Sequence, residues 1–143
     1  MKTVSISAIP LLLLIIFSFS FRGKSSDKIN TPLIGTHWNL VELNGQKVAI
    51  NATSKPMYLE FKPDSTVSGN GGCNAFSGSF GTSNKNEISF GDMVRTNVLC
   101  AGIDNEKKFL DALAKSDHYK ISNDTLILRN QMVDLAKLVA GKK

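Results

Sequence analysis

Few side chains in this 143-residue sequence could carry out chemistry, and the two cysteines are the most informative of them. In an exported chain, two cysteines such as Cys73 and Cys100 are typical of one disulfide bond. The spacing alone also allows two buried free thiols, or two cysteine ligands of a bound metal ion. As metal ligands, the two cysteines would lack the C-x-x-C spacing of zinc sites, and His37 and His118 are isolated in the sequence. We therefore predict a disulfide and no bound metal.

The other reactive side chains do not form a recognisable catalytic constellation. Asp64 and Asp92 border predicted turns, where solvated carboxylates are expected, and no serine lies in the G-x-S-x-G pattern of a nucleophile elbow. A phosphate-binding loop would need a lysine and a helix directly after the glycines, and both are missing. We therefore predict a noncatalytic protein without a cofactor. The alternative is an enzyme, for example a hydrolase, whose site residues are dispersed along the chain.

The glycine-rich segment around Cys73 is the most distinctive part of the sequence. Glycine is needed where the backbone takes positive φ or approaches another chain closely, and a turn that only connects two strands rarely needs so many. We expect a tight turn followed by a strand whose alternating residues are half-buried. The Asn74 amide lies next to this tight turn and is expected to cap backbone groups, with substrate binding as the alternative. The structural motif consists of Gly69, Gly71, Gly72, Asn74, Phe76, Gly78 and Phe80.

The N-terminus is predicted to be a signal peptide over residues 1–20. Lys2 precedes an apolar run, and Ser18-Phe19-Ser20 is a small-x-small triplet that suits cleavage after Ser20. An uncleaved anchor is the alternative, although the run is shorter than the ~20 residues that span a bilayer. No cysteine lies at the cleavage site, which excludes an N-terminal lipoprotein. We expect an exported protein, periplasmic or secreted, without a transmembrane segment after cleavage.

The rest of the chain is predicted to be a flexible leader over residues 21–32 and one domain over residues 33–140. The formal net charge is +5, but the basic residues do not cluster. Because nucleic-acid binding requires a concentrated basic face with stacking aromatic residues, we expect no nucleic-acid partner.

Short strands separated by tight turns dominate the predicted domain. Asn44-Gly45 is a strong hairpin signal, and the strand before it changes phase in a way that indicates a bulge. Apolar periodicity predicts one helix over about residues 105–115, with Asp104 as its N-cap. Residues 132–139 fit a helix slightly better than a strand. The predicted class is therefore α+β, mainly antiparallel, with a partly open β-barrel or sandwich packed on the single helix.

Four motifs resemble the META domain, also called the HslJ-like domain. Gly35-x-x-Trp38-x-Leu40 is similar to its opening, and the glycine-rich segment through Phe80 is similar to its central motif. Thr96-x-x-x-Cys100 and Leu126-x-Leu128 resemble its later motifs. The resemblance covers about residues 33–140. It implies a partly open antiparallel barrel on one helix, and it favours a final strand over residues 132–139.

The resemblance also implies a bacterial cell-envelope protein, with links to heat or antibiotic stress, and it supplies no catalytic residues. We expect a noncatalytic module that binds an envelope protein or a small apolar ligand. An inhibitor of an envelope hydrolase is an alternative within the same class. Trp38, Phe76 and Phe80 are candidates to line a ligand cavity, with simple core packing as the alternative.

Overall fold

The computed structural model describes residues 30–49, 55–101 and 103–141, which form ten strands and one helix. The predicted signal peptide, over residues 1–20, and residues 21–29 of the predicted leader lie outside this part of the chain. The strands are β1 (His37–Leu43), β2 (Gln46–Lys47), β3 (Tyr58–Phe61), β4 (Thr66–Asn70), β5 (Ala75–Thr82), β6 (Ile88–Phe90), β7 (Val94–Arg95), β8 (His118–Ser122), β9 (Thr125–Asn130) and β10 (Val133–Ala140). The helix is α1 (Asp104–Lys115).

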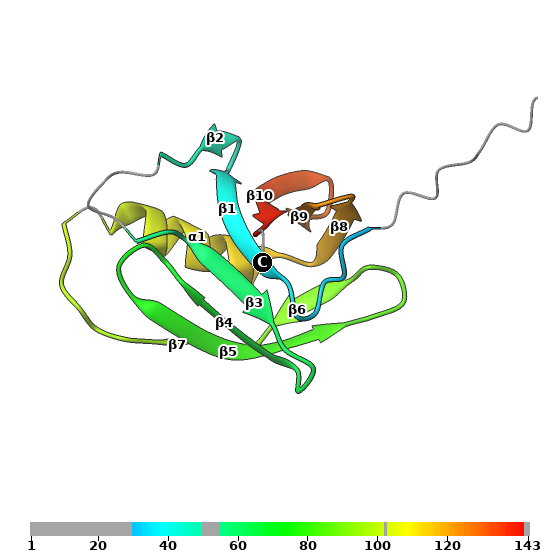
Figure 1. Ribbon diagram of the computed structural model, residues 1–143, viewed down its shortest axis with the longest axis horizontal. Coiled ribbons are helices and arrows are strands. Elements are labelled where there is room, and N and C mark those ends of the chain that lie inside the picture. Colours follow the sequence, from blue (N-terminus) through cyan, green and yellow to red (C-terminus); the bar gives the residue numbers. More distant parts are fainter. Residues whose placement is uncertain (1–29, 50–54, 102, 142–143) are drawn as a thin grey trace, which may run out of the picture.

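The strands form one antiparallel sheet that curls into a nearly closed barrel (Figure 1). Their order is β6-β5-β4-β3-β1-β10-β9-β8, and β2 and β7 add short pairings to β1 and β5. The two end strands meet at a seam, where the Ile88 N–H donates to the Asp117 carbonyl at 2.9 Å. The Tyr119 N–H donates to the Asn86 carbonyl across the same seam, also at 2.9 Å. This architecture confirms the predicted fold class.

The central strand β1 has the two irregularities that its sequence predicts. Its register against β10 shifts between Leu40 and Glu42, which corresponds to the change of phase in its apolar pattern. At its end, Asn44 and Gly45 both have positive φ, 49° and 78°, as a type I′ hairpin turn requires. The chain therefore turns back into β2 beside the start of α1.

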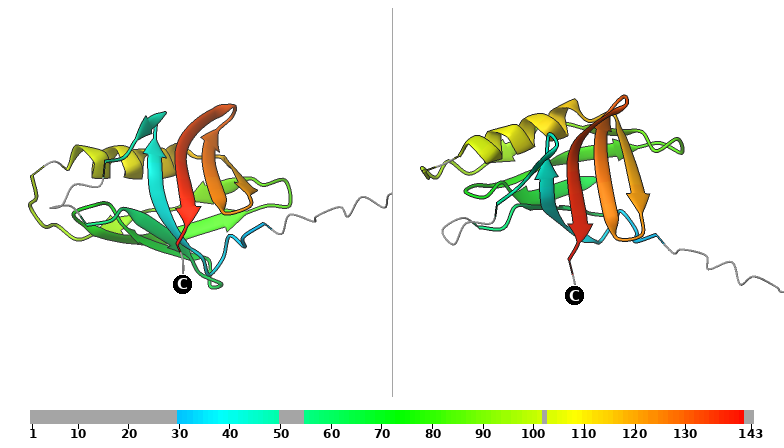
Figure 2. Two further views of the ribbon diagram at one scale, coloured as in Figure 1. Left: turned by 45° about the horizontal axis from the view of Figure 1, so that its top comes forward. Right: turned by 90° about the horizontal axis from the view of Figure 1, so that it is seen from above.

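The helix α1 occupies nearly the predicted residues, but its start differs in detail. Asp104 is the first helical residue, and no side chain caps the helix at Ile103, so the prediction of an Asp104 N-cap is wrong. The Asp104 carboxylate still lies in the first turn, where the helix dipole favours a negative charge. One face of α1 is buried in the core through Glu106, Phe109, Ala112 and Leu113. Figure 2 shows this helix lying along one side of the strands.

The last segment forms strand β10, although its periodicity alone favours a helix slightly. The strand lies between β1 and β9 and pairs with both of them, so its backbone groups are satisfied on each edge. Ala136 and Leu138 alternate into the core at 2% and 0% exposure. Tertiary pairing therefore outweighs the weak helical pattern, as the family resemblance implies.

The hydrophobic core lies between the curled sheet and α1. The Phe76 and Phe109 rings join the sheet to the helix, with their centroids 5.9 Å apart in an edge-to-face arrangement. Phe61 and Phe80 make a similar pair at 4.8 Å. Trp38 is fully buried, and its indole N–H donates to the Leu33 carbonyl at 3.0 Å. Among the described residues, no helix is both long enough and apolar enough to cross a membrane.

Candidate functional site

The turn between β4 and β5 carries the glycine-rich motif and has a backbone that other residues would strain. Gly72 has φ of 101°, and its N–H donates to the Asn70 side-chain oxygen at 2.8 Å. Gly71 faces the helix so closely that an added Cβ would lie 2.5 Å from the Glu106 Cγ. The turn therefore lets the backbone of residues 70–74 approach the first turn of α1. Gly69 and Gly78 lie in the flanking strands, β4 and β5.

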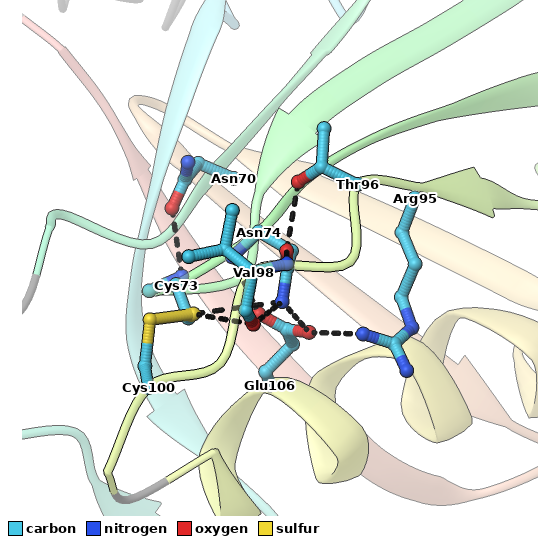
Figure 3. The surroundings of a disulfide bond; sticks show 9 residues. Asn70, Cys73, Asn74, Arg95, Thr96, Val98, Cys100 and Glu106 are labelled. Carbon is cyan, nitrogen blue, oxygen red and sulfur yellow. Dashed lines mark hydrogen bonds and ion pairs between the residues drawn. A yellow bond between two sulfur atoms is a disulfide. The ribbon is translucent and has the colours of Figure 1, made fainter.

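Asn74 connects this turn to the segment before the helix (Figure 3). Its side-chain oxygen accepts hydrogen bonds from the Thr96 hydroxyl at 2.8 Å and from the Val98 N–H at 2.7 Å. Its amide nitrogen donates to the Val98 carbonyl at 3.2 Å and to Glu106 Oε1 at 3.0 Å. The side chain is 1% exposed, so this buried amide is fully used within the fold.

Glu106 is the buried charge of this region, and its role was missed by the sequence analysis. One carboxylate oxygen accepts from the Asn74 N–H at 2.7 Å, and the other lies 3.3 Å from the Arg95 guanidinium. A buried carboxylate needs such partners, because an unpaired charge would be costly to bury. The signal was present in the sequence, since Glu106 precedes Phe109 and Leu113 on the apolar face of the helix.

Cys73 and Cys100 are joined by a disulfide bond in the structure. Their Cα atoms are 6.1 Å apart, within the range of unstrained disulfides. The bond ties the motif turn to the loop between β7 and α1. We call this region the motif knot; it comprises the turn of residues 70–74, Arg95, Thr96, Val98, Cys100 and Glu106.

A cavity of about 520 Å³ lies between the motif knot, β1 and the hairpin that β1 forms with β2. The disulfide forms part of its wall. Its ionisable residues among the described ones are Lys55 and Glu106, and Asn39 and Asn105 also line it. Its apolar lining includes Leu40, Val48, Ala49, Met57, Ile103 and Val139.

The three aromatic residues that were candidates to line a ligand cavity lie in the core instead. Trp38, Phe76 and Phe80 are 0%, 4% and 8% exposed. The described lining of the cavity does not include any of them. Two of their neighbours, Leu40 and Met57, do line it. The pattern of alternating residues could predict burial, but it could not show that the free space lies beside β1.

The ionisable groups with shifted pKa values lie away from this cavity. Hydrogen bonds from the Thr66 hydroxyl and N–H lower the pKa of Asp64 at the β3–β4 turn. The His118 ring and the Gln131 N–H lower the pKa of Asp117 at the seam. In the part of the chain that the structure describes, no three histidine, cysteine or acidic residues are grouped as metal ligands.

A family model for the META domain matches residues 31–141, which is most of the chain. The chain belongs to the META domain family. No curated protein matches its sequence.

Solved structures share the META domain fold of this chain. A protein from Burkholderia xenovorans, determined by NMR, superimposes with a TM-score of 0.59 at 24% identity, covering 78% of this chain and 85% of its own. A second NMR structure gives 0.59 at 22% identity, over 75% of this chain and 91% of that one. The crystal structure of a DUF4847 family protein from Bacteroides vulgatus gives 0.57 at 14% identity, over 78% and 96%. At these identities the similarity concerns the fold alone.

Proposed function

We propose that this META domain protein is a noncatalytic, exported module of the bacterial envelope that binds a small apolar ligand and supports stress tolerance. The cavity beside β1 carries the proposal. Its volume of about 520 Å³ falls within the range of small-molecule sites, and apolar side chains form most of its wall with a few polar groups among them.

The chemistry of the cavity supports binding over catalysis. Its carboxylate, Glu106, holds the Asn74 backbone and amide and pairs with Arg95, so it is committed to the fold. A general acid or base would need to reach the reacting group of a substrate. The cavity cysteines are joined to each other, which removes them as nucleophiles.

A neutral fluorescent probe tests the proposal directly. N-phenyl-1-naphthylamine should bind the purified full chain saturably, and Val48→Trp should weaken this binding at least about tenfold by filling the cavity. The matched control is Val133→Trp, because Val133 is 63% exposed and is not part of the described cavity lining. Absence of saturable binding, or equal binding by the two variants, would exclude the cavity as the binding site.

The same two variants test the biological part of the proposal. In a deletion strain exposed to heat and envelope-active antibiotics, the Val133→Trp protein should restore growth and the Val48→Trp protein should not. Turnover of an ester or peptide substrate by the purified protein would favour the hydrolase alternative. Stoichiometric inhibition of an envelope hydrolase by both variants would favour the inhibitor alternative, and with it a protein partner.

A further inference from the structure

We propose that the ligand is an amphiphile with one anionic head group, which lies between Lys47 and Lys108 while the apolar body fills the larger cavity. This inference rests on the proposed function and specifies its ligand. It follows from a second, smaller hollow beside the cavity.

The second hollow has a volume of about 200 Å³ and adjoins the larger cavity. Val48 and Asn105 line both, so the two spaces are neighbours near the end of the β1–β2 hairpin and the start of α1. Their linings differ in character. The hollow is lined mainly by polar side chains, namely Asn44, Gln46, Lys47, Asn105 and Lys108, with Leu43 and Val48. A ligand that spans both spaces would therefore need an apolar part and a polar part.

The charged residues of the hollow indicate the sign of the charge on the polar part of the ligand. Lys47 on β2 and Lys108 on α1 both line it, and its described lining contains no acidic residue. Within the described residues, the ammonium groups of these two lysines form no ion pair with a carboxylate. Two unpaired cations that face one space favour an anion there, and the neighbouring amides can donate hydrogen bonds to it.

The nearest acidic residues in sequence and register do not neutralise these lysines. Glu42 is opposite Lys47 in the β1–β2 pairing, but its carboxylate bonds the Lys137 ammonium at 2.9 Å. Asp104 and Asp111 lie on the same helix as Lys108 without forming an ion pair with it. In the larger cavity, Glu106 is paired with Arg95. The combined site therefore keeps a positive balance, to which Lys55 adds at the larger cavity.

A pair of probes that differ only in the head group tests this inference. We choose 11-(dansylamino)undecanoic acid and its uncharged methyl ester, titrated by fluorescence into the purified full chain at low salt. The acid should bind about tenfold more tightly than the ester, and the difference should shrink as salt screens the exposed lysines.

The variant Lys47→Gln/Lys108→Gln should bind the acid about 3- to 10-fold more weakly and the ester with unchanged affinity. The matched control, Lys85→Gln/Lys120→Gln, removes two charges from positions outside both described linings and should bind both probes as the wild type does.

Three other results would overturn the inference, and they differ in what they imply for the proposed function. If acid and ester bind equally and Val48→Trp blocks both, the apolar site is upheld and the anionic head is wrong. If both double variants weaken the acid equally, general charge explains the binding and the assigned lysines are wrong. If neither probe binds, the proposed function and the inference fail together.

Discussion

Two regions complete the barrel, and they do so by different means. The motif knot joins a turn, a loop and the helix through a disulfide, a buried amide and a buried carboxylate. The seam between β6 and β8 is closed by main-chain hydrogen bonds of Ile88 and Tyr119, with one isolated pairing between Glu87 and His118. Buried polar networks are costly to disturb when one member is lost, whereas the seam is joined by isolated main-chain hydrogen bonds. We therefore expect the knot to resist opening and the seam to open first.

Replacing Asn74 with alanine should have the largest effect on stability. The substitution leaves the buried Glu106 carboxylate and the partly buried Val98 backbone groups without their hydrogen bonds to this amide, which should lower the free energy of unfolding by about 3–5 kcal/mol. Asn130→Ala is the matched control, because its amide makes one exposed hydrogen bond to the Lys115 carbonyl and should cost under about 1 kcal/mol. Urea denaturation measures both. Equal midpoints would contradict the proposed contrast between the knot and the periphery.

Removing the disulfide should have the next largest effect. The bond closes a loop between residues 27 positions apart, for which chain entropy assigns about 3.5 kcal/mol. Cys73→Ser/Cys100→Ser should therefore lower the free energy of unfolding by roughly this amount. Thiol titration of the unfolded, unreduced wild type should find no free thiols. Two free thiols would refute the bond itself.

Gly71→Ala should cost about 1–3 kcal/mol, because the new methyl group would displace the Glu106 side chain from its hydrogen bonds. Gly45→Ala provides a useful comparison. Its positive φ strains alanine, but its surroundings are open, so any loss there reports backbone strain alone. If the two variants have the same denaturation midpoint, close approach to the helix does not explain the glycine at position 71.

Acidification should weaken the seam by a smaller amount. Hydrogen bonds from His118 and Gln131 hold the pKa of Asp117 below its ordinary value of 3.8. A carboxyl group whose pKa is lowered on folding contributes stability above the unfolded pKa, and this contribution is lost as the pH falls through the folded value. Asp117→Asn should therefore be less stable than the wild type near neutral pH and closer to it at about pH 2.5. A midpoint difference that is unchanged with pH would exclude this role of Asp117.

The sequence predicted the elements of the knot better than it predicted their connections. The four glycines indicate a turn with an unusual backbone conformation, and the two cysteines of a chain predicted to be exported indicate a disulfide. Both signals are local, so the turn could be recognised directly from the sequence. Glu106 was not recognised, because a single acidic residue at a helix start is explained equally well by the helix dipole. Its burial depends on Gly71 and Asn74, which are distant along the chain.

The cavity is the part of the site that sequence patterns could least predict. The alternation of apolar and polar residues identifies the side chains that are buried, and Trp38, Phe76 and Phe80 are indeed buried. It carries no information about where packing leaves space. The same limit explains why the final strand needed the family resemblance, since the edges that pair with β10 come from β1 and β9.

The position of Trp38 makes it an intrinsic fluorescent probe of the fold. It is the only tryptophan in the sequence, and its indole ring is shielded from solvent, so its emission should change sharply when the barrel unfolds. Its chain neighbours Asn39 and Leu40 line the larger cavity, which places a bound dansyl group close to this ring. Energy transfer from this single donor to the probe would therefore report binding without a further label on the protein.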